Sequence, residues 1–155
     1  MKITEAIALE HATLLRVFDE VELVLPRLKS AGEVGRLAGI LEGVLRTHAE
    51  LEIEFAFVAL DHALYHKRHL ETLHQDHREL DARFRQAQEA TACAGARRLL
   101  QEAMRASREH FRHEERGLFP VVERTLGLGV SATLGEAFKK KARKADAKRA
   151  KQTKM

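Results

Sequence analysis

The chain has 155 residues, of which 45% are hydrophobic and 32% are charged, so it can bury one hydrophobic core without a second domain. Cys93 is the single cysteine, which excludes an internal disulfide, and no N-terminal segment has the pattern of a secretory signal. No apolar run approaches the roughly 20 residues that a membrane span requires. We therefore expect a soluble protein of the reducing cytoplasm.

The formal net charge of +4 is unevenly distributed along the chain. Residues 139–155 contain nine Lys or Arg and one acidic residue, Asp146. Without this segment the totals of 27 basic and 23 acidic residues fall to 18 and 22, so the rest of the chain is acidic. A basic segment of this kind can contact nucleic acid, but lysine-rich ends are more often only solvated. We expect the solvated state.

Helix-forming residues dominate the composition, Trp is absent and Pro occurs twice, which predicts an all-α fold. The first predicted helix covers residues 4–25, where apolar residues recur at the spacing of a buried helical stripe. Pro26 should end it, and residues 30–32 read as a turn. A second stripe covers residues 37–59.

The second half of the chain repeats this organisation. Stripes over residues 70–84 and 99–117 predict a third and a fourth helix, separated by a turn at residues 91–95 that contains the cysteine. The break between the second and third helices is placed near residues 63–67. After the fourth helix, Ser131 could cap a short amphipathic helix that continues into the basic tail.

These elements predict an antiparallel up-down four-helix bundle over residues 1–130 and a short helix with a lysine-rich tail over residues 131–155. Polar residues interrupt the apolar stripes of all four helices. Each stripe contains a histidine, and in two helices a glutamate follows four residues later, one turn along the same face. These residues are His11, His48, Glu52, His77, His110 and Glu114. A buried carboxylate without a partner is costly, and a bound metal removes that cost.

The spacing of these residues allows them to share one layer of the bundle. Antiparallel helices present residues at one level only if each connecting turn lies midway between the residues it separates. The midpoints are Ser30, residues 93–94 and the region of residues 63–67, which are the three predicted turns. All six residues can therefore converge on one site.

The two halves of the chain also resemble each other. Residues 10–14 match residues 76–80, and the His-x-x-x-Glu of residues 48–52 matches that of residues 110–114. Two hairpins related by a pseudo-twofold axis would each supply two histidines and one carboxylate. This set suits two metals bridged by two carboxylates, about 3.5 to 4 Å apart. Imidazole and carboxylate donors without thiolate favour iron over a structural zinc.

The order H, HxxxE, H, HxxxE on successive helices resembles the hemerythrin-like HHE cation-binding domains, over roughly residues 4–126. The resemblance implies iron ligation by all six residues. It places His11 and His48 on one iron and His77 and His110 on the other, with both glutamates bridging.

The chain departs from the oxygen-carrying hemerythrins, which have HxxxH in the third helix and end the fourth-helix motif in aspartate. Here Leu73 takes the place of the first of those histidines, and Glu114 that of the aspartate. The resemblance is closer to relatives associated with iron sensing, nitric oxide or peroxide handling and iron–sulfur repair.

Several alternatives remain open from the sequence. The first is a diiron site that reacts with O₂, peroxide or NO, the second is an iron- or oxygen-sensing module without turnover, and the third is a plain bundle with structural histidines. A ferritin-like site needs two Glu-x-x-His motifs and the chain has one, at residues 71–74. His74 is a possible further ligand and His113 a weaker one, whereas His62, His66 and His69 are expected to be solvated.

Overall fold

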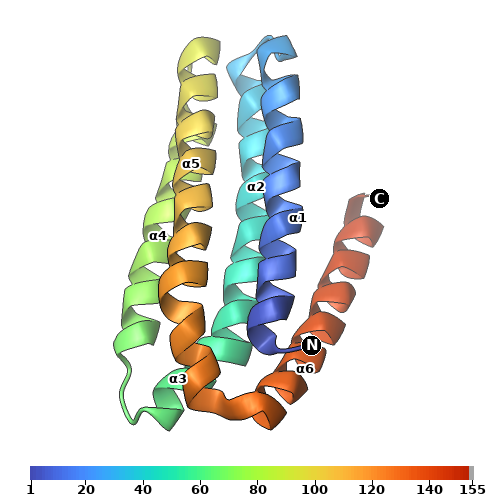
Figure 1. Cartoon of the computed structure of the whole chain (residues 1–155). Helices are drawn as coiled ribbons and strands as arrows, with labels where there is room; N and C mark the ends of the chain where they lie inside the picture. Colours follow the sequence, from blue (N-terminus) through green and yellow to red (C-terminus); the bar gives the residue numbers. More distant parts are fainter. Residues whose placement is uncertain (154–155) are drawn as a thin grey trace.

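The computed structural model describes residues 1–153, in which every regular element is helical (Figure 1). Four long helices run alternately up and down and form the bundle. They are α1 (Ile3–Val24), α2 (Ala31–Glu52), α4 (Arg68–Glu89) and α5 (Cys93–His113). The predicted all-α four-helix bundle is confirmed. Within the described residues, no helix combines the length and the apolar character that crossing a bilayer demands.

Shorter elements extend the ends of these helices. They are the 3₁₀-helix η1 (Leu25–Arg27), the π-helical segments η2 (Ile53–Phe57) and η3 (Glu114–Leu118), and the short helix α3 (Val58–Ala63). The last element, α6 (Phe119–Thr153), continues from η3. Pro26 lies in η1, so it ends the first helix as predicted.

The three turns of the bundle follow from local sequence. Ser30 caps α2, because its hydroxyl oxygen accepts a hydrogen bond from the backbone N–H of Glu33 at 3.1 Å. The second turn lies between Ala63 and Arg68, as predicted. The third is shorter than predicted, and Cys93 is the first residue of α5 rather than a loop residue. Its thiol lies 3.6 Å from the carbonyl oxygen of Leu28.

The helix α6 contains a kink at Gly127, whose φ of 72° lies in the region that favours glycine. Beyond the kink, α6 turns back and runs beside α1 (Figure 1). We predicted that Ser131 would cap its own helix, and this prediction was wrong. Its side chain is buried, and its hydroxyl oxygen accepts a hydrogen bond from the backbone N–H of Ile3 at 3.2 Å. Ser131 therefore satisfies a free donor at the start of α1.

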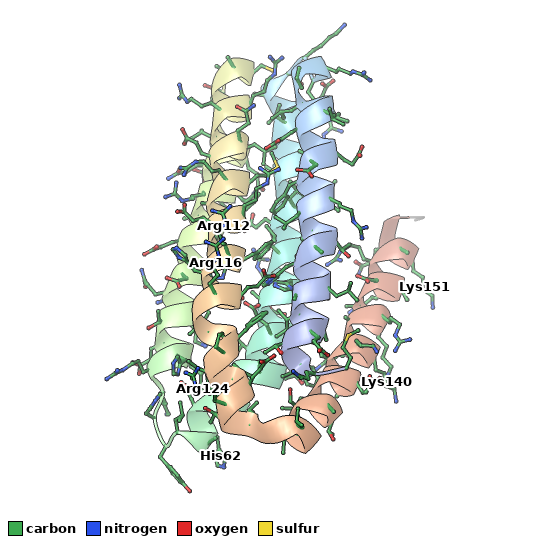
Figure 2. The ribbon with its side chains drawn as sticks, viewed as in Figure 1. His62, Arg112, Arg116, Arg124, Lys140 and Lys151 are labelled. Carbon is green, nitrogen blue, oxygen red and sulfur yellow. The ribbon has the colours of Figure 1, made fainter. Side chains whose placement is uncertain are left out.

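The basic segment is helical as far as Thr153, whereas residues 154–155 lie outside the described part. Phe138 is buried against α1 and the π-helical segment η2. Lys141 donates hydrogen bonds to the carboxylate of Glu54 at 2.7 and 2.8 Å, and Arg149 donates to the Thr47 hydroxyl at 3.0 Å. This half of α6 packs on the bundle, while Lys140 and Lys151 project away from it (Figure 2).

The hydrophobic core consists of two clusters, one toward each end of the bundle. Phe18, Leu100 and Met104 belong to the first cluster, whereas Ile7 and Phe57 belong to the second. Along the four bundle helices, the polar residues singled out in the sequence lie where residues of the first cluster give way to residues of the second. The apolar ends thus hold a polar layer in the middle of the bundle.

Candidate metal centre

All six predicted residues lie in this layer, on the inner faces of α1, α2, α4 and α5 and at the start of η3. The side chains of His11 and Glu52 are fully buried, and that of Glu114 is 1% exposed. His77 and His110 are slightly more open, at 12% and 10%. The site is therefore enclosed from the side of α1 and most accessible near α4 and α5.

One half of the site is formed by α1 and α2. The Nε2 atoms of His11 and His48 face each other at 3.1 Å. The Oε2 atom of Glu52 lies 3.1 Å from the Nε2 atom of His48 and 3.7 Å from that of His11. Three possible ligand atoms thus meet at one point.

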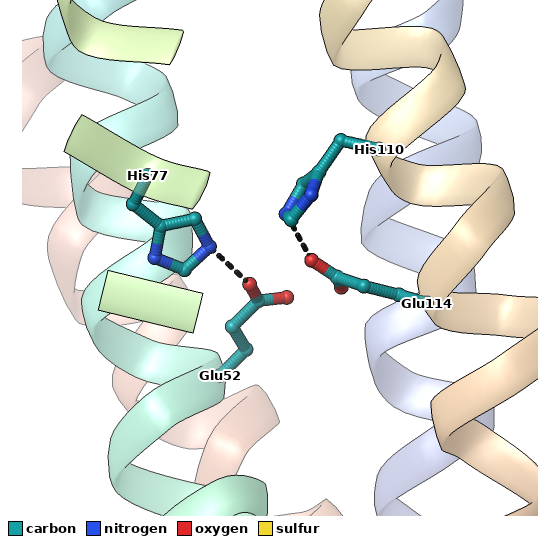
Figure 3. Close-up of side chains that lie close together, drawn as sticks. All are labelled: Glu52, His77, His110 and Glu114. Atoms are coloured by element: carbon teal, nitrogen blue, oxygen red, sulfur yellow. Dashed lines mark hydrogen bonds and ion pairs between the residues drawn. The ribbon is translucent and has the colours of Figure 1, made fainter. Parts of the chain in front are cut away.

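The other half is formed by α4 and α5 (Figure 3). The Nε2 atom of His77 lies 3.0 Å from Oε1 of Glu52, and Nε2 of His110 is in contact with Oε1 of Glu114. The two histidine rings pack edge to face, with centroids 5.2 Å apart. These four residues form a second group whose ligand atoms are close enough to share one ion.

The two carboxylates connect the halves. Glu52 directs Oε2 toward His11 and His48 and Oε1 toward His77. Glu114 directs Oε1 toward His110, and its Oε2 lies 3.6 Å from Nε2 of His11. Each glutamate therefore has one oxygen on the side of each histidine pair, as a bridging carboxylate requires.

Several of these buried atoms make only close charge contacts without hydrogen-bond geometry. They are Oε2 of Glu52, Nε2 of His110 and both side-chain oxygens of Glu114. A buried polar atom without a hydrogen bond costs on the order of 1–3 kcal/mol. Metal ions bonded to these atoms would remove that cost, so the residues present fit a metal centre.

A family model for the hemerythrin HHE cation-binding domain matches the chain over residues 2–122 and again over residues 68–145. The first match covers most of the chain. The chain belongs to this family. Neither the curated proteins nor the solved structures gave a match. The second match begins at Arg68, the first residue of α4, which is where the second hairpin starts. Membership indicates that this HHE domain binds a metal cation, of which iron is typical.

Two further carboxylates contact the histidines of the HHE domain from outside the layer. Oε1 of Glu10 lies 2.6 Å from Nδ1 of His48, and Oε1 of Glu115 lies 3.0 Å from Nδ1 of His11. A carboxylate on Nδ1 keeps the proton there and leaves the Nε2 lone pair for a metal. Sequence reasoning did not assign these residues. The signal available was that each is adjacent in sequence to a predicted ligand.

A π-helical segment follows each His-x-x-x-Glu motif. In η2 the backbone N–H of Val58 bonds to the carbonyl of Ile53, and in η3 that of Phe119 bonds to the carbonyl of Glu114. The backbone therefore departs from the α-helix at the same place after both motifs. Single π turns inside helices are frequent at functional sites.

Burial and charge set the protonation of the metal-free site. Burial alone would lower the pKa of His48, but the Glu52 charge and the Glu10 carboxylate that accepts from its Nδ1 raise it to about 10. Burial alone would raise the pKa of Glu52, yet the His48 charge, the nearby His11 and the hydrogen bond from His77 hold it well below its usual value. These two residues therefore form a charged pair.

The pKa of the second carboxylate, Glu114, is shifted in the opposite direction from that of Glu52. Burial, reinforced by the Glu52 charge, raises the pKa of Glu114 to about 7. Burial would lower the pKa of His110, but its close contact and charge interaction with Glu114 raise it. Two carboxylates in one dry layer cannot both ionise without added positive charge. Metal ions would supply that charge.

A cavity of about 20 Å³ adjoins the site, which is room for about one water molecule. Its polar wall is formed by His48, Glu52, His77 and His110. The remaining wall is mostly apolar and consists of Leu45, Ala49, Leu80, Asp81, Phe84 and Phe111. A small molecule in this cavity would touch the predicted ligands and little water.

The other residues weighed in the sequence take different places. His74 and His113 are exposed and belong to none of the possible metal-binding groups within residues 1–153. Leu73 is buried in the second core cluster. The Phe111 ring stacks on the His11 ring with centroids 4.2 Å apart. The Phe119 ring also lies stacked with the His11 ring, with centroids 5.9 Å apart. These rings keep water from the most buried histidine.

Proposed function

We propose that the chain binds two iron ions in the polar layer and that the resulting centre binds or reacts with O₂, hydrogen peroxide or NO. The observation that carries this proposal is the placement of the two carboxylates. Glu52 and Glu114 each have one oxygen near each histidine pair. A single metal would need only one histidine pair and one carboxylate. Six donors, divided into two histidine pairs with two carboxylates between them, suit two ions.

The proposed division of ligands follows the two halves of the layer. His11 and His48 would hold one iron, and His77 and His110 the other, with Glu52 and Glu114 shared. Imidazole and carboxylate donors without thiolate are typical of non-haem iron sites. When bound, the two irons supply two electrons and at least one position that no protein donor fills.

Residues around the site would orient its ligands and limit the access of water to the open coordination position. Glu10 and Glu115 fix the ring orientation and tautomer of His48 and His11. Phe84 and Phe111 form part of the wall that limits water near the ligands. The cavity has the size of a diatomic molecule or a water rather than of an organic substrate.

The direct test is the optical spectrum of the iron-loaded, reduced protein before and after exposure to O₂, hydrogen peroxide or NO. We expect new near-ultraviolet and visible bands, and none from iron-free protein. His77→Ala should weaken the response far more than His74→Ala, because His77 faces Glu52 whereas His74 is exposed. Equal losses in the two variants would contradict the ligand assignment.

A second variant tests the cavity. Ala49 lines it without being a ligand, so Ala49→Leu should fill the space and slow the spectral change while the iron content stays the same. An unchanged rate would mean that small molecules reach the metals by another route. If the iron-loaded wild-type protein responds to none of the three reagents, an iron- or oxygen-sensing module without turnover becomes the better account.

A further inference from the structure

A second cluster of possible metal ligands lies at the turn between α3 and α4, away from the polar layer. It contains Asp61, His66 and His69, whose ligand atoms all lie within 4.8 Å of one another. Oδ1 of Asp61 is 2.7 Å from Nδ1 of His69 and 3.6 Å from Nδ1 of His66. The two rings have centroids 5.2 Å apart. We predicted that these histidines are solvated; His66 is exposed and His69 half-buried, and both lie beside a buried carboxylate.

The backbone of the turn builds this cluster. The N–H of His66 bonds to the carbonyl of Asp61 at 3.0 Å, and the N–H of Tyr65 bonds to that of His62 at 3.2 Å. This pair of bonds is the Schellman motif that ends many helices, and it returns His66 to the level of Asp61. Tyr65 has a φ of 56°, in the region where glycine is usual, so the turn is held at some cost.

The Asp61 carboxylate is almost fully buried, at 2% exposed. Its Oδ2 accepts a hydrogen bond from the backbone N–H of Leu70 at 2.9 Å, which fixes the carboxylate at the start of α4. Oδ1 is left to face the two histidines. The Nδ1 atom of His66 accepts a hydrogen bond from the N–H of Arg68 at 3.2 Å, so this nitrogen carries no proton, and an ion bound there would take its lone pair in place of that hydrogen bond.

The distances suit an ion with short bonds. Donors bonded to a tetrahedral zinc at about 2.0–2.1 Å lie about 3.3 Å apart. The two distances from Oδ1 of Asp61, 2.7 and 3.6 Å, lie on either side of this value. A small rotation of the His69 ring would therefore admit an ion in place of the proton shared with Asp61.

The surroundings select the class of ion. One carboxylate at a helix N-terminus, with Lys67 lining the same groove, offers too little negative charge for Ca²⁺ or Mg²⁺. Two imidazoles beside one carboxylate, with positions left open, suit Zn²⁺ and other divalent transition ions, Fe²⁺ included. The groove has a volume of about 370 Å³ and is also lined by His62, so further positions on the ion would be open. Figure 2 shows His62 at this end of the molecule.

We propose that Asp61, His66 and His69 form a second, peripheral site for one Zn²⁺-like ion, separate from the centre in the bundle. The test is to titrate the full chain with Zn²⁺ by calorimetry and to count bound zinc after gel filtration. Wild-type protein should bind one more ion per chain than the His66→Ala/His69→Ala double variant. This difference does not depend on whether the bundle site holds iron, zinc or nothing.

Matched variants separate ligation from folding. His74→Ala and His113→Ala remove exposed histidines outside the cluster and should leave the zinc count unchanged. Asp61→Asn retains an oxygen that can accept from Leu70 but loses the charge, so it should weaken zinc binding at least tenfold while circular dichroism stays unchanged. Equal zinc counts in wild type and the double variant would overturn the proposal, as would wild-type affinity in Asp61→Asn.

Discussion

Carboxylates surround the histidines of this HHE domain in two different positions. Glu52 and Glu114 lie within the polar layer, whereas Glu10 and Glu115 contact the outer Nδ1 atoms. Without metal the inner pair is asymmetric, because Glu52 is charged against His48 and Glu114 has a pKa of about 7. Protons and metal ions therefore compete for the same atoms.

This competition predicts how the stability of iron-free protein depends on pH. Folded His48 keeps its proton up to about pH 10, whereas the ordinary value is 6.5. Its favourable contribution is thus complete below about pH 6.5 and is lost as the pH rises toward 10. The pKa of Glu114 is raised from 4.5 to about 7, so the stability contributed by its protonated form is lost between these pH values and changes little above neutral pH. Between pH 8 and pH 10, the Tm measured by circular dichroism should fall.

The control for this prediction is the variant His48→Gln, which keeps a polar side chain but cannot titrate. Its Tm should be lower at pH 8 and should change less up to pH 10. Groups that lose protons elsewhere in the chain affect both proteins equally. The same decline in wild type and variant would mean that the charged pair with Glu52 does not contribute.

Residues of the inner layer could be predicted from the sequence, and the outer ones could not. His48 and Glu52 interrupt an apolar stripe, so the sequence predicts that they are buried polar groups whose desolvation must be offset by a partner or a ligand. Glu10 and Glu115 are partly exposed, and acidic residues at such positions are common on helices. Only the distances to Nδ1 of the histidines distinguish them from ordinary surface glutamates.

At the scale of elements, the apolar periodicity predicted the helices, and the midpoints between the predicted ligands agreed with the predicted turns. The break near residues 63–67 has no Gly or Pro, yet its predicted position matches the end of α3 at Ala63. The π-helical segments η2 and η3 were not predicted. One extra residue per π turn changes the apolar spacing too little to be recognised against an α-helix.

The packing of α6 on α1 was also not predicted, and glycine substitutions test it. A Cβ atom at Gly135 would lie 2.9 Å from the carbonyl carbon of Lys2 and 3.0 Å from the backbone nitrogen of Ile3, so Gly135→Ala should lower the Tm. At Gly129 nothing lies within 4 Å of such an atom, and Gly129→Ala should stabilise the helix by up to about 1 kcal/mol. Thermal unfolding that moves in the same direction for both variants would contradict the close contact.

At the scale of the whole molecule, the basic half of α6 covers one side of the bundle. A cavity of about 130 Å³ lies between α1, α2 and α6, and Glu10, His48 and Arg149 are among the residues that line it. Charge counting marked residues 139–155 as distinct from the rest of the chain but could not show that the described part of this segment, as far as Thr153, packs on the bundle. The partners that hold them, Thr47 and Glu54, look like ordinary helix surface in the sequence.

Removal of this segment should expose the outer side of the site. We expect the chain truncated after Phe138 to keep its iron, because all six ligands remain, but to lose iron to a chelator several times faster than wild type. The helical circular dichroism signal should fall in proportion to the residues removed. Loss of most of the iron on purification would show instead that α6 is needed to form the site.

The central claim is that two carboxylates join two irons in one layer of the bundle. The measurement that tests it most directly is iron per chain in protein loaded and purified without oxygen. Wild type and Glu50→Ala, an exposed residue of the same helix, should each contain about two irons. Glu52→Ala and Glu114→Ala should each contain markedly fewer, because each variant removes an oxygen from both metals. One iron in the wild type, or two in either variant, would contradict the bridged pair.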